Sequence, residues 1–234
     1  MALNKETFRV RALTALVFVA VMLTGLLVNE WTFLVLFTVI HFGCWYEFTR
    51  ILEKIYDASY FPYTLAGVLY ITIPILMLID FRMPLLDFRP VGREFGVGNT
   101  VPVLIILSIW VNDTMAYLVG SFIGKTPFSK ISPKKTWEGT IGGATLCIVV
   151  IGFIFPFVAE RFFVPFEHTY TYFVIAAICA VFGTLGDLLE SKLKRQANIK
   201  DSGTIMPGHG GFLDRFDSLL VATPFVWVYL EFFV

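Results

Sequence analysis

Seven long apolar stretches alternate with short polar ones along the 234 residues of the chain. They cover about residues 12–28, 31–48, 64–80, 101–120, 141–160, 170–190 and 216–234. Each is near the ~20 residues with which an α-helix crosses the hydrocarbon core of a bilayer. The pattern predicts an all-α fold, a polytopic integral membrane helix bundle with about seven transmembrane helices.

The composition agrees with a surface that meets lipid. Hydrophobic residues make up 57% of the chain, charged residues only 15%, and mean hydropathy is +0.76. The 18 lysines and arginines balance the 18 acids, which argues against nucleic acid as a partner because nucleic acid binding needs a basic face. No repeat or linker divides the sequence, so residues 1–234 are expected to form a single transmembrane catalytic domain.

The positions of lysine and arginine predict the orientation in the membrane. If the N-terminus is cytoplasmic, 14 of the 18 basic residues lie in cytoplasmic segments, in keeping with the positive-inside rule. The four on the outer side are Arg82, Arg89, Arg93 and Arg161. We expect a multi-pass protein of the cell (inner/plasma) membrane.

Two polar loops fall on the same predicted cytoplasmic face, at about 120–140 and 191–216. Loops longer than about 12–15 residues are often functional. In the first loop, Ser132 and Pro133 read as a helix N-cap followed by proline at the first helical position, with Lys134 and Lys135 next. The two loops predict a site at the boundary between membrane and cytoplasm.

Three acids are expected at one membrane depth. Asp187 shares a helical face with the small residues Ala180 and Gly183, whereas Asp214 and Asp217 open the last helix. Taken alone, the last two are better explained as helix-capping acids. Like charges 4 Å apart repel by about 4 kcal/mol at an effective dielectric of 20, so converging carboxylates need protonation or a cation. Oxygen ligands favour a hard cation such as Mg²⁺.

Asp113 is a fourth candidate because it interrupts an apolar run. An acid at the centre of a membrane helix costs on the order of 2.5–3.5 kcal/mol and marks a functional site by default. It is expected to be a metal ligand or a close neighbour of one. The alternative is an interhelical hydrogen-bonding role, with Asn112 as a partner.

The second loop also has features that suit phosphate. Gly210 and Gly211 allow main-chain N–H groups to converge on an anion, and the dipole of the last helix adds to this. Lys194, Arg195 and Lys200 supply positive charge. His209, between glycines, suits phosphate binding, proton transfer or the capping of a turn. Together these features predict a metal-and-phosphate site.

The stretch SKLKRQANIKDSGTIMPGHGGFLDRFD, residues 191–217, resembles the signature of the phosphatidate cytidylyltransferases, or CDP-diacylglycerol synthases. SPKKTWEG and NDTMAYLVG resemble two further segments of that family. The resemblance implies transfer of the cytidylyl group of CTP to phosphatidate, giving CDP-diacylglycerol and pyrophosphate. CTP, phosphatidate and membrane lipid are then the partners, Mg²⁺ is the cofactor, alone or with a second cation, and a homodimer is expected.

The resemblance also implies residue roles. The catalytic residues would be Asp187, Asp214, Asp217, Lys194 and His209. The metal ligands would be Asp187, Asp214, Asp217 and Asp113. The substrate-binding residues would be Ser132, Lys134, Lys135, Ser191, Lys194, Arg195, Lys200, Asp201, Gly210, Gly211 and Arg215.

Two other functions use similar features. A CTP-dependent polyprenol or phytol kinase would also handle CTP in a membrane bundle, but would transfer the γ-phosphate. A membrane transporter would also place an acid within the membrane, but its polar residues would be spread through several helices. Here they gather at one face.

Overall fold

A computed structural model describes residues 5–83, 98–205 and 210–234 of the chain. The long helices are α1 (Lys5–Leu27), α2 (Glu30–Tyr56), α5 (Thr100–Ile123), α6 (Trp137–Phe162), α7 (Tyr170–Gln196) and α8 (Leu213–Phe233). Between α2 and α5, two 3₁₀ turns (Asp57–Ser59 and Phe61–Thr64), α3 (Leu65–Gly67), a π-helical turn (Val68–Thr72) and α4 (Ile73–Arg82) follow one another. The described residues contain no β-strand, and Pro127 and Thr136 form an isolated β-bridge.

The all-α membrane fold is confirmed. Six helical segments among the described residues are long and apolar enough to cross a membrane, namely Glu30–Ser59, Phe61–Arg82, Thr100–Ile123, Trp137–Phe162, Tyr170–Gln196 and Leu213–Phe233. The first predicted span corresponds to a shorter apolar helix, Ala12–Leu27. The protein is therefore a polytopic membrane protein.

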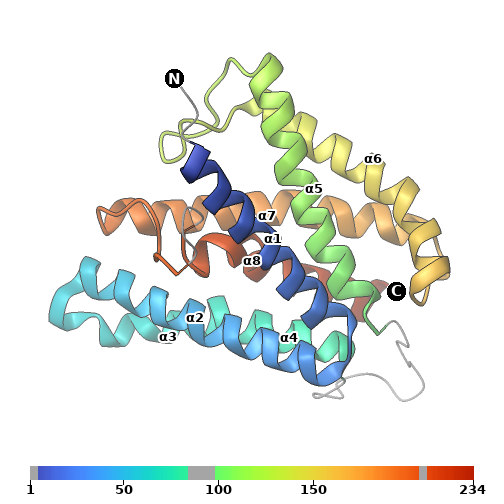
Figure 1. The fold of residues 1–234 in the computed structure, drawn as a ribbon, viewed down its shortest axis with the longest axis horizontal. Coiled ribbons are helices and arrows are strands. Elements are labelled where there is room, and N and C mark those ends of the chain that lie inside the picture. Colours follow the sequence, from blue (N-terminus) through green and yellow to red (C-terminus); the bar gives the residue numbers. More distant parts are fainter. Residues whose placement is uncertain (1–4, 84–97, 206–209) are drawn as a thin grey trace.

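The helices pack as a bundle in which α7 and α8 lie beside one another through its middle (Figure 1). α5 packs along α6, and α7 contacts α5, α6 and α8. α2 and α4 cover the other side of α8. The C-terminal end of α2, the loop before α6 and the segment between α7 and α8 all lie in the left half of Figure 1. Both polar loops are thus held at one end of the bundle.

Small residues set the distances between these helices. On α6, Gly139 and Gly143 lie against Ala116 and Gly120 of α5, where an added Cβ would meet main-chain atoms. On α7, the face that carries Ala180 and Gly183 is buried, and Gly183 lies beside Ser218 of α8. The predicted faces of small residues therefore do bring helices close together.

Three helix ends differ from the prediction. α7 continues to Gln196, so residues 191–196 are helical instead of forming the start of a loop. α8 begins at Leu213, slightly earlier than expected. α6 begins at Trp137, and not at Ser132 and Pro133, because the Thr136 side chain caps it by accepting the Gly139 N–H at 3.1 Å.

The residues before α6 form a short hairpin. The Phe128 N–H donates to the Lys135 carbonyl at 2.8 Å, and the Lys135 N–H donates to the Ser132 carbonyl at 3.1 Å. The Glu138 carboxylate closes the base of the hairpin by accepting the Lys125 N–H at 3.2 Å and the Thr126 hydroxyl at 2.8 Å. The hairpin presents Lys135 toward Asp187 of α7.

Candidate active site

A cavity of about 500 Å³ opens where α5, α6, α7 and α8 meet the hairpin before α6. Its polar lining includes Asn112, Asp113, Ser132, Lys134, Lys135, Asp187, Asp214, Asp217 and Ser218. Residues from both predicted site loops and from the predicted intramembrane acid therefore share one cavity.

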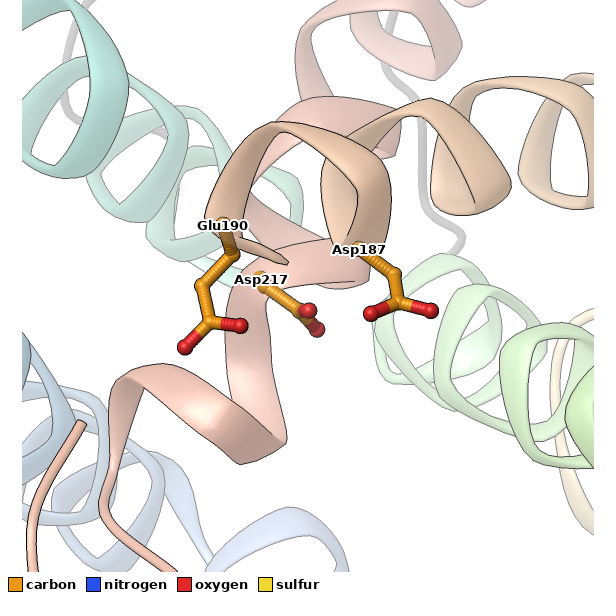
Figure 2. A group of neighbouring side chains, drawn as sticks. All are labelled: Asp187, Glu190 and Asp217. Atoms are coloured by element: carbon orange, nitrogen blue, oxygen red, sulfur yellow. The ribbon is translucent and has the colours of Figure 1, made fainter. Parts of the chain in front are cut away.

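Three carboxylates converge beside this cavity. Asp187 and Glu190 project from α7, and Asp217 projects from α8 between them (Figure 2). One carboxylate oxygen from each lies within 4.8 Å of the others. Glu190 is fully buried and Asp217 is 7% exposed, whereas Asp187 is half-buried. At this separation each like-charged pair repels by about 3–4 kcal/mol at an effective dielectric of 20.

The surroundings of Asp187, Glu190 and Asp217, called the acidic trio below, fit a divalent cation. Among the described residues Glu190 Oε1 has no hydrogen-bond donor, and Oε2 is paired with Lys194. Asp217 Oδ1 accepts the Ser218 N–H at 2.6 Å. A buried carboxylate without hydrogen bonds is costly unless a charge compensates it. Carboxylate oxygens in this number and spacing are the donor set that a hard cation such as Mg²⁺ uses.

Gly186 allows α7 and α8 to approach at the site. A Cβ on this residue would lie 2.5 Å from the Asp217 carbonyl oxygen and 3.0 Å from Ser218 Cα. Only glycine lets the α7 backbone come this near to the α8 backbone. The contact places Asp187, the next residue on α7, opposite Asp217.

Two lysines link the acids to neighbouring elements. Lys135 of the hairpin forms an ion pair with Asp187. Lys194 forms ion pairs with Glu190, four residues before it on α7, and with Asp214 Oδ1 at 2.6 Å. Lys194 is only 13% exposed, so its charge is directed at these carboxylates. Lys135, by contrast, lines the cavity itself.

Asp214 has different surroundings from the acidic trio. Its Oδ2 accepts the N–H groups of Ser202 and Gly211, each at 2.8 Å, and the Ser202 hydroxyl at 2.9 Å. Asp214 was expected beside Asp187 and Asp217, but in the structure those two lie together with Glu190. Asp214 instead ties the segment before α8 to its first turn, while still lining the cavity.

The glycine segment before α8 also differs from the expected anion nest. Gly210 has a positive φ of 86°, as such a turn requires. However, the Gly211 N–H donates to Asp214, and the next two N–H groups donate to Glu47 of α2. The protein's own carboxylates therefore occupy the donors that were expected to meet phosphate.

Asp113 is exposed to the cavity and not packed between helices. The Asn112 side chain donates a hydrogen bond to it within α5, and not between helices as the alternative held. Lys135 and Asp187 are close enough to interact with it electrostatically. Asn112 itself is buried, and its Oδ1 has no hydrogen-bond donor among the described residues. Both side chains face the acidic trio from the α5 side.

The remaining predicted residues lie in different places. Ser132 and Lys134 line the main cavity, and Ser191 donates to Asp187 Oδ1 at 3.4 Å. Arg195 and Arg215 are exposed at the ends of α7 and α8. Lys200 and Asp201 line a different cavity, of about 480 Å³, against the end of α2. His209 lies outside the described residues.

Two acids in this region, Glu190 and Glu47, were not among the predicted site residues. Glu190 continues the Asp187 face of α7, so its i+3 spacing was available as a signal. Glu47 lies within the apolar run of α2 and is 1% exposed. A charged residue in such a run is a signal of function, but only the fold shows which segment it meets.

Comparison with known proteins agrees with this site. The profile of the cytidylyltransferase family matches residues 73–233. A phosphatidate cytidylyltransferase of Rickettsia felis is 34% identical over 231 residues, covering 96% of this chain and 92% of the relative. The Bacillus subtilis enzyme of that name is 47% identical over 126 residues, which cover 53% of this chain and 45% of the relative. The Thermotoga maritima enzyme is 41% identical over 143 residues, which cover 60% and 52%.

The family match spans α4 to α8 and thus includes the cavity, both lysine-bearing segments and all three acids of the trio. The full-length similarity to the Rickettsia felis relative extends this to α1 and α2. The chain belongs to the cytidylyltransferase family.

Proposed function

We propose that the protein transfers the cytidylyl group of CTP to phosphatidate. An oxygen of the lipid phosphate attacks the α-phosphorus of CTP and forms a new P–O bond. The bond between the α-phosphorus and the oxygen that bridges to the β-phosphate breaks, and pyrophosphate leaves. The products are CDP-diacylglycerol and pyrophosphate.

The observation that carries this proposal is the cavity in which hairpin lysines face carboxylates of α5, α7 and α8. Basic side chains suit the triphosphate, and a cluster of carboxylates suits a cation shared with phosphate oxygens. The volume of the cavity, about 500 Å³, is in the range of small-molecule sites. The family and the named relatives favour nucleotidyl transfer over the kinase and transporter alternatives.

The reaction needs no strong general base, because the attacking phosphate oxygen is already anionic. The difficulty is that two polyanions must meet, so positioning and charge compensation are the main contributions of the protein. We assign Lys134 and Lys135, with Ser132, to the triphosphate. Lys194 acts differently, since it holds Glu190 and Asp214 in place.

Asp187, Glu190 and Asp217 would hold a divalent cation, with Asp113 facing them across the cavity. When bound, a cation such as Mg²⁺ supplies positive charge that offsets the repulsion between the substrates and stabilises the leaving pyrophosphate. The Lys135 ion pair with Asp187 would place the triphosphate next to this cluster. Asp214 contributes by orienting the first turn of α8.

The site belongs at the cytoplasmic surface of the bacterial inner membrane. The bias of lysine and arginine supports a cytoplasmic position for the hairpin and the α7–α8 segment. Acyl chains would then remain in the bilayer while the headgroup meets a soluble nucleotide. A homodimer remains a prediction from the family resemblance.

The test uses purified protein in detergent with phosphatidate, Mg²⁺ and CTP that carries a label on either the α- or the γ-phosphate. Label from the α-position is expected in the lipid fraction, and γ-label in released pyrophosphate. Asp217→Asn is expected to reduce turnover by about 100-fold or more while the protein still inserts into the membrane. Addition of EDTA is expected to stop the reaction.

Each alternative has its own outcome. Transfer of γ-label to a lipid alcohol, with α-label left in water, would establish the kinase. If neither label is transferred, both the cytidylyltransferase and the kinase are rejected, and the transporter is the function to test next. Full activity in the Asp217 variant would show that the cation needed for turnover does not bind at the acidic trio.

A further inference from the structure

Glu47 is a buried acid that the proposed chemistry does not use. It lies on α2 and is 1% exposed, within a helix whose neighbouring residues Cys44 and Phe48 are also buried. A carboxylate removed from water in this way costs several kcal/mol unless it is well hydrogen-bonded. Its partners therefore indicate what the residue is for.

The Glu47 carboxylate caps α8 from another helix. Oε1 accepts the Phe212 N–H and Oε2 accepts the Leu213 N–H, both at 2.9 Å. These are among the N–H groups that the start of a helix leaves without an intrahelical acceptor. The residue at the N-cap position is Phe212, whose side chain cannot accept a hydrogen bond. Glu47 thus supplies the cap that the local sequence lacks, from 165 residues away.

A second connection runs from Glu47 to Asp214 through one hydroxyl. Ser202 Oγ lies 2.7 Å from Glu47 Oε2 and 2.9 Å from Asp214 Oδ2. It also accepts the Asp214 N–H at 3.2 Å, so the next free donor of α8 is satisfied as well. The first three N–H groups of this helix end therefore depend on Glu47 and Ser202.

Two glycines make room for the carboxylate. A Cβ at Gly203 or at Gly211 would overlap the Glu47 carboxylate oxygens. Gly203 and Gly211 thus both lie against the Glu47 side chain. Packing and hydrogen bonds agree that Glu47 sets where α8 begins.

We propose that Glu47 is a positioning residue for cytidylyl transfer. By fixing the first turn of α8 it sets the place of Asp217, which lies one turn after Leu213, opposite Asp187 and Glu190. The inference rests on the proposed function for its link to catalysis. The position of the α8 acid relative to the α7 acids, however, is measurable without turnover.

The test compares Glu47→Gln with Glu53→Gln. Glu53 lies on the same helix and is exposed, so it undergoes the same chemical change away from α8. In the Glu47 variant either orientation of the amide places an NH₂ group against a main-chain N–H of α8. Mn²⁺ affinity is measured by electron paramagnetic resonance titration of each purified protein, and kcat and KM by α-label transfer.

Glu47→Gln is expected to weaken Mn²⁺ binding about tenfold and to lower kcat about tenfold or more, with KM for CTP changed less than about threefold. Glu53→Gln is expected to match wild type in all three. A Glu47 variant that only melts at a lower temperature, with unchanged Mn²⁺ affinity and kcat in the folded fraction, would overturn the proposal.

If Glu47→Gln does not fold, Ser202→Ala is the second variant. It keeps both main-chain bonds to Glu47 and removes the hydroxyl that contacts Glu47 Oε2, Asp214 Oδ2 and the Asp214 N–H. It is expected to lower kcat about fivefold, the equivalent of one hydrogen bond; unchanged kcat and Mn²⁺ affinity would again refute the idea. A wild-type protein that transfers no label, yet loses Mn²⁺ affinity on Glu47→Gln, would reject the cytidylyl transfer and leave the positioning role intact.

Discussion

The close approach of α7 to α8 at Gly186 makes Gly186→Ala a sensitive test of the site geometry. The added Cβ would lie 2.5 Å from the Asp217 carbonyl oxygen and 3.0 Å from two further main-chain atoms. Main-chain atoms cannot rotate away, so one helix has to move. Restoring an ordinary contact of 3.4 Å requires about 0.9 Å of displacement between the helices.

The magnitude follows from two effects. Overpacking of this kind costs about 1–3 kcal/mol, of which alanine's better helix propensity returns about 1 kcal/mol. The protein is therefore expected to fold. A displacement of reacting groups by about 1 Å can cost about 100-fold in rate, so we expect α-label transfer to fall about 10- to 100-fold.

Gly183→Ala is the matched control, three residues earlier on the same face of α7. Its Cβ would be 3.4 Å from the nearest atom, Ser218 Cβ, which is an ordinary contact. This variant is expected to keep wild-type activity and to be at least as stable. The reasoning is refuted if Gly186→Ala is fully active, or if Gly183→Ala loses as much activity.

Three further variants probe the elements around the cavity. Lys135→Ala removes the ion pair with Asp187 and a positive charge from the cavity. In a CTP titration, KM for CTP is expected to rise about tenfold, and an unchanged KM would contradict the triphosphate role. Glu138→Gln weakens the hydrogen bonds by which the Glu138 carboxylate holds Thr126 at the base of the hairpin, so kcat is expected to fall several-fold without a change in membrane insertion. Wild-type activity would show that the site does not depend on these hydrogen bonds. Lys54→Ala, which lines the separate cavity at the end of α2, is expected to change activity less than about twofold, and a large loss would extend the site to that cavity.

Much of the site could be predicted from local pattern. The spacing of small residues placed Asp187 on an inward face, and the acids that follow the glycines placed Asp217 at the start of the last helix. These predictions depend on the 3.6-residue period, which holds within a helix whatever surrounds it. Helix ends were predicted less well, because the α6 start depends on a hydrogen bond from the Thr136 side chain and on the pairing of the hairpin.

The sequence by itself determined the membrane-spanning helical class, the inward faces and the family signature, because hydropathy and periodicity are properties of continuous segments. Only the tertiary structure decided which carboxylates converge. It joined Glu190 to Asp187 and Asp217, engaged Asp214 with Lys194 and Ser202, and brought Glu47 to the start of α8. The hydrogen-bonded partners among these, 12 to 166 residues apart, are selected by the close packing of helices, and such contacts leave no periodic signal in a single chain.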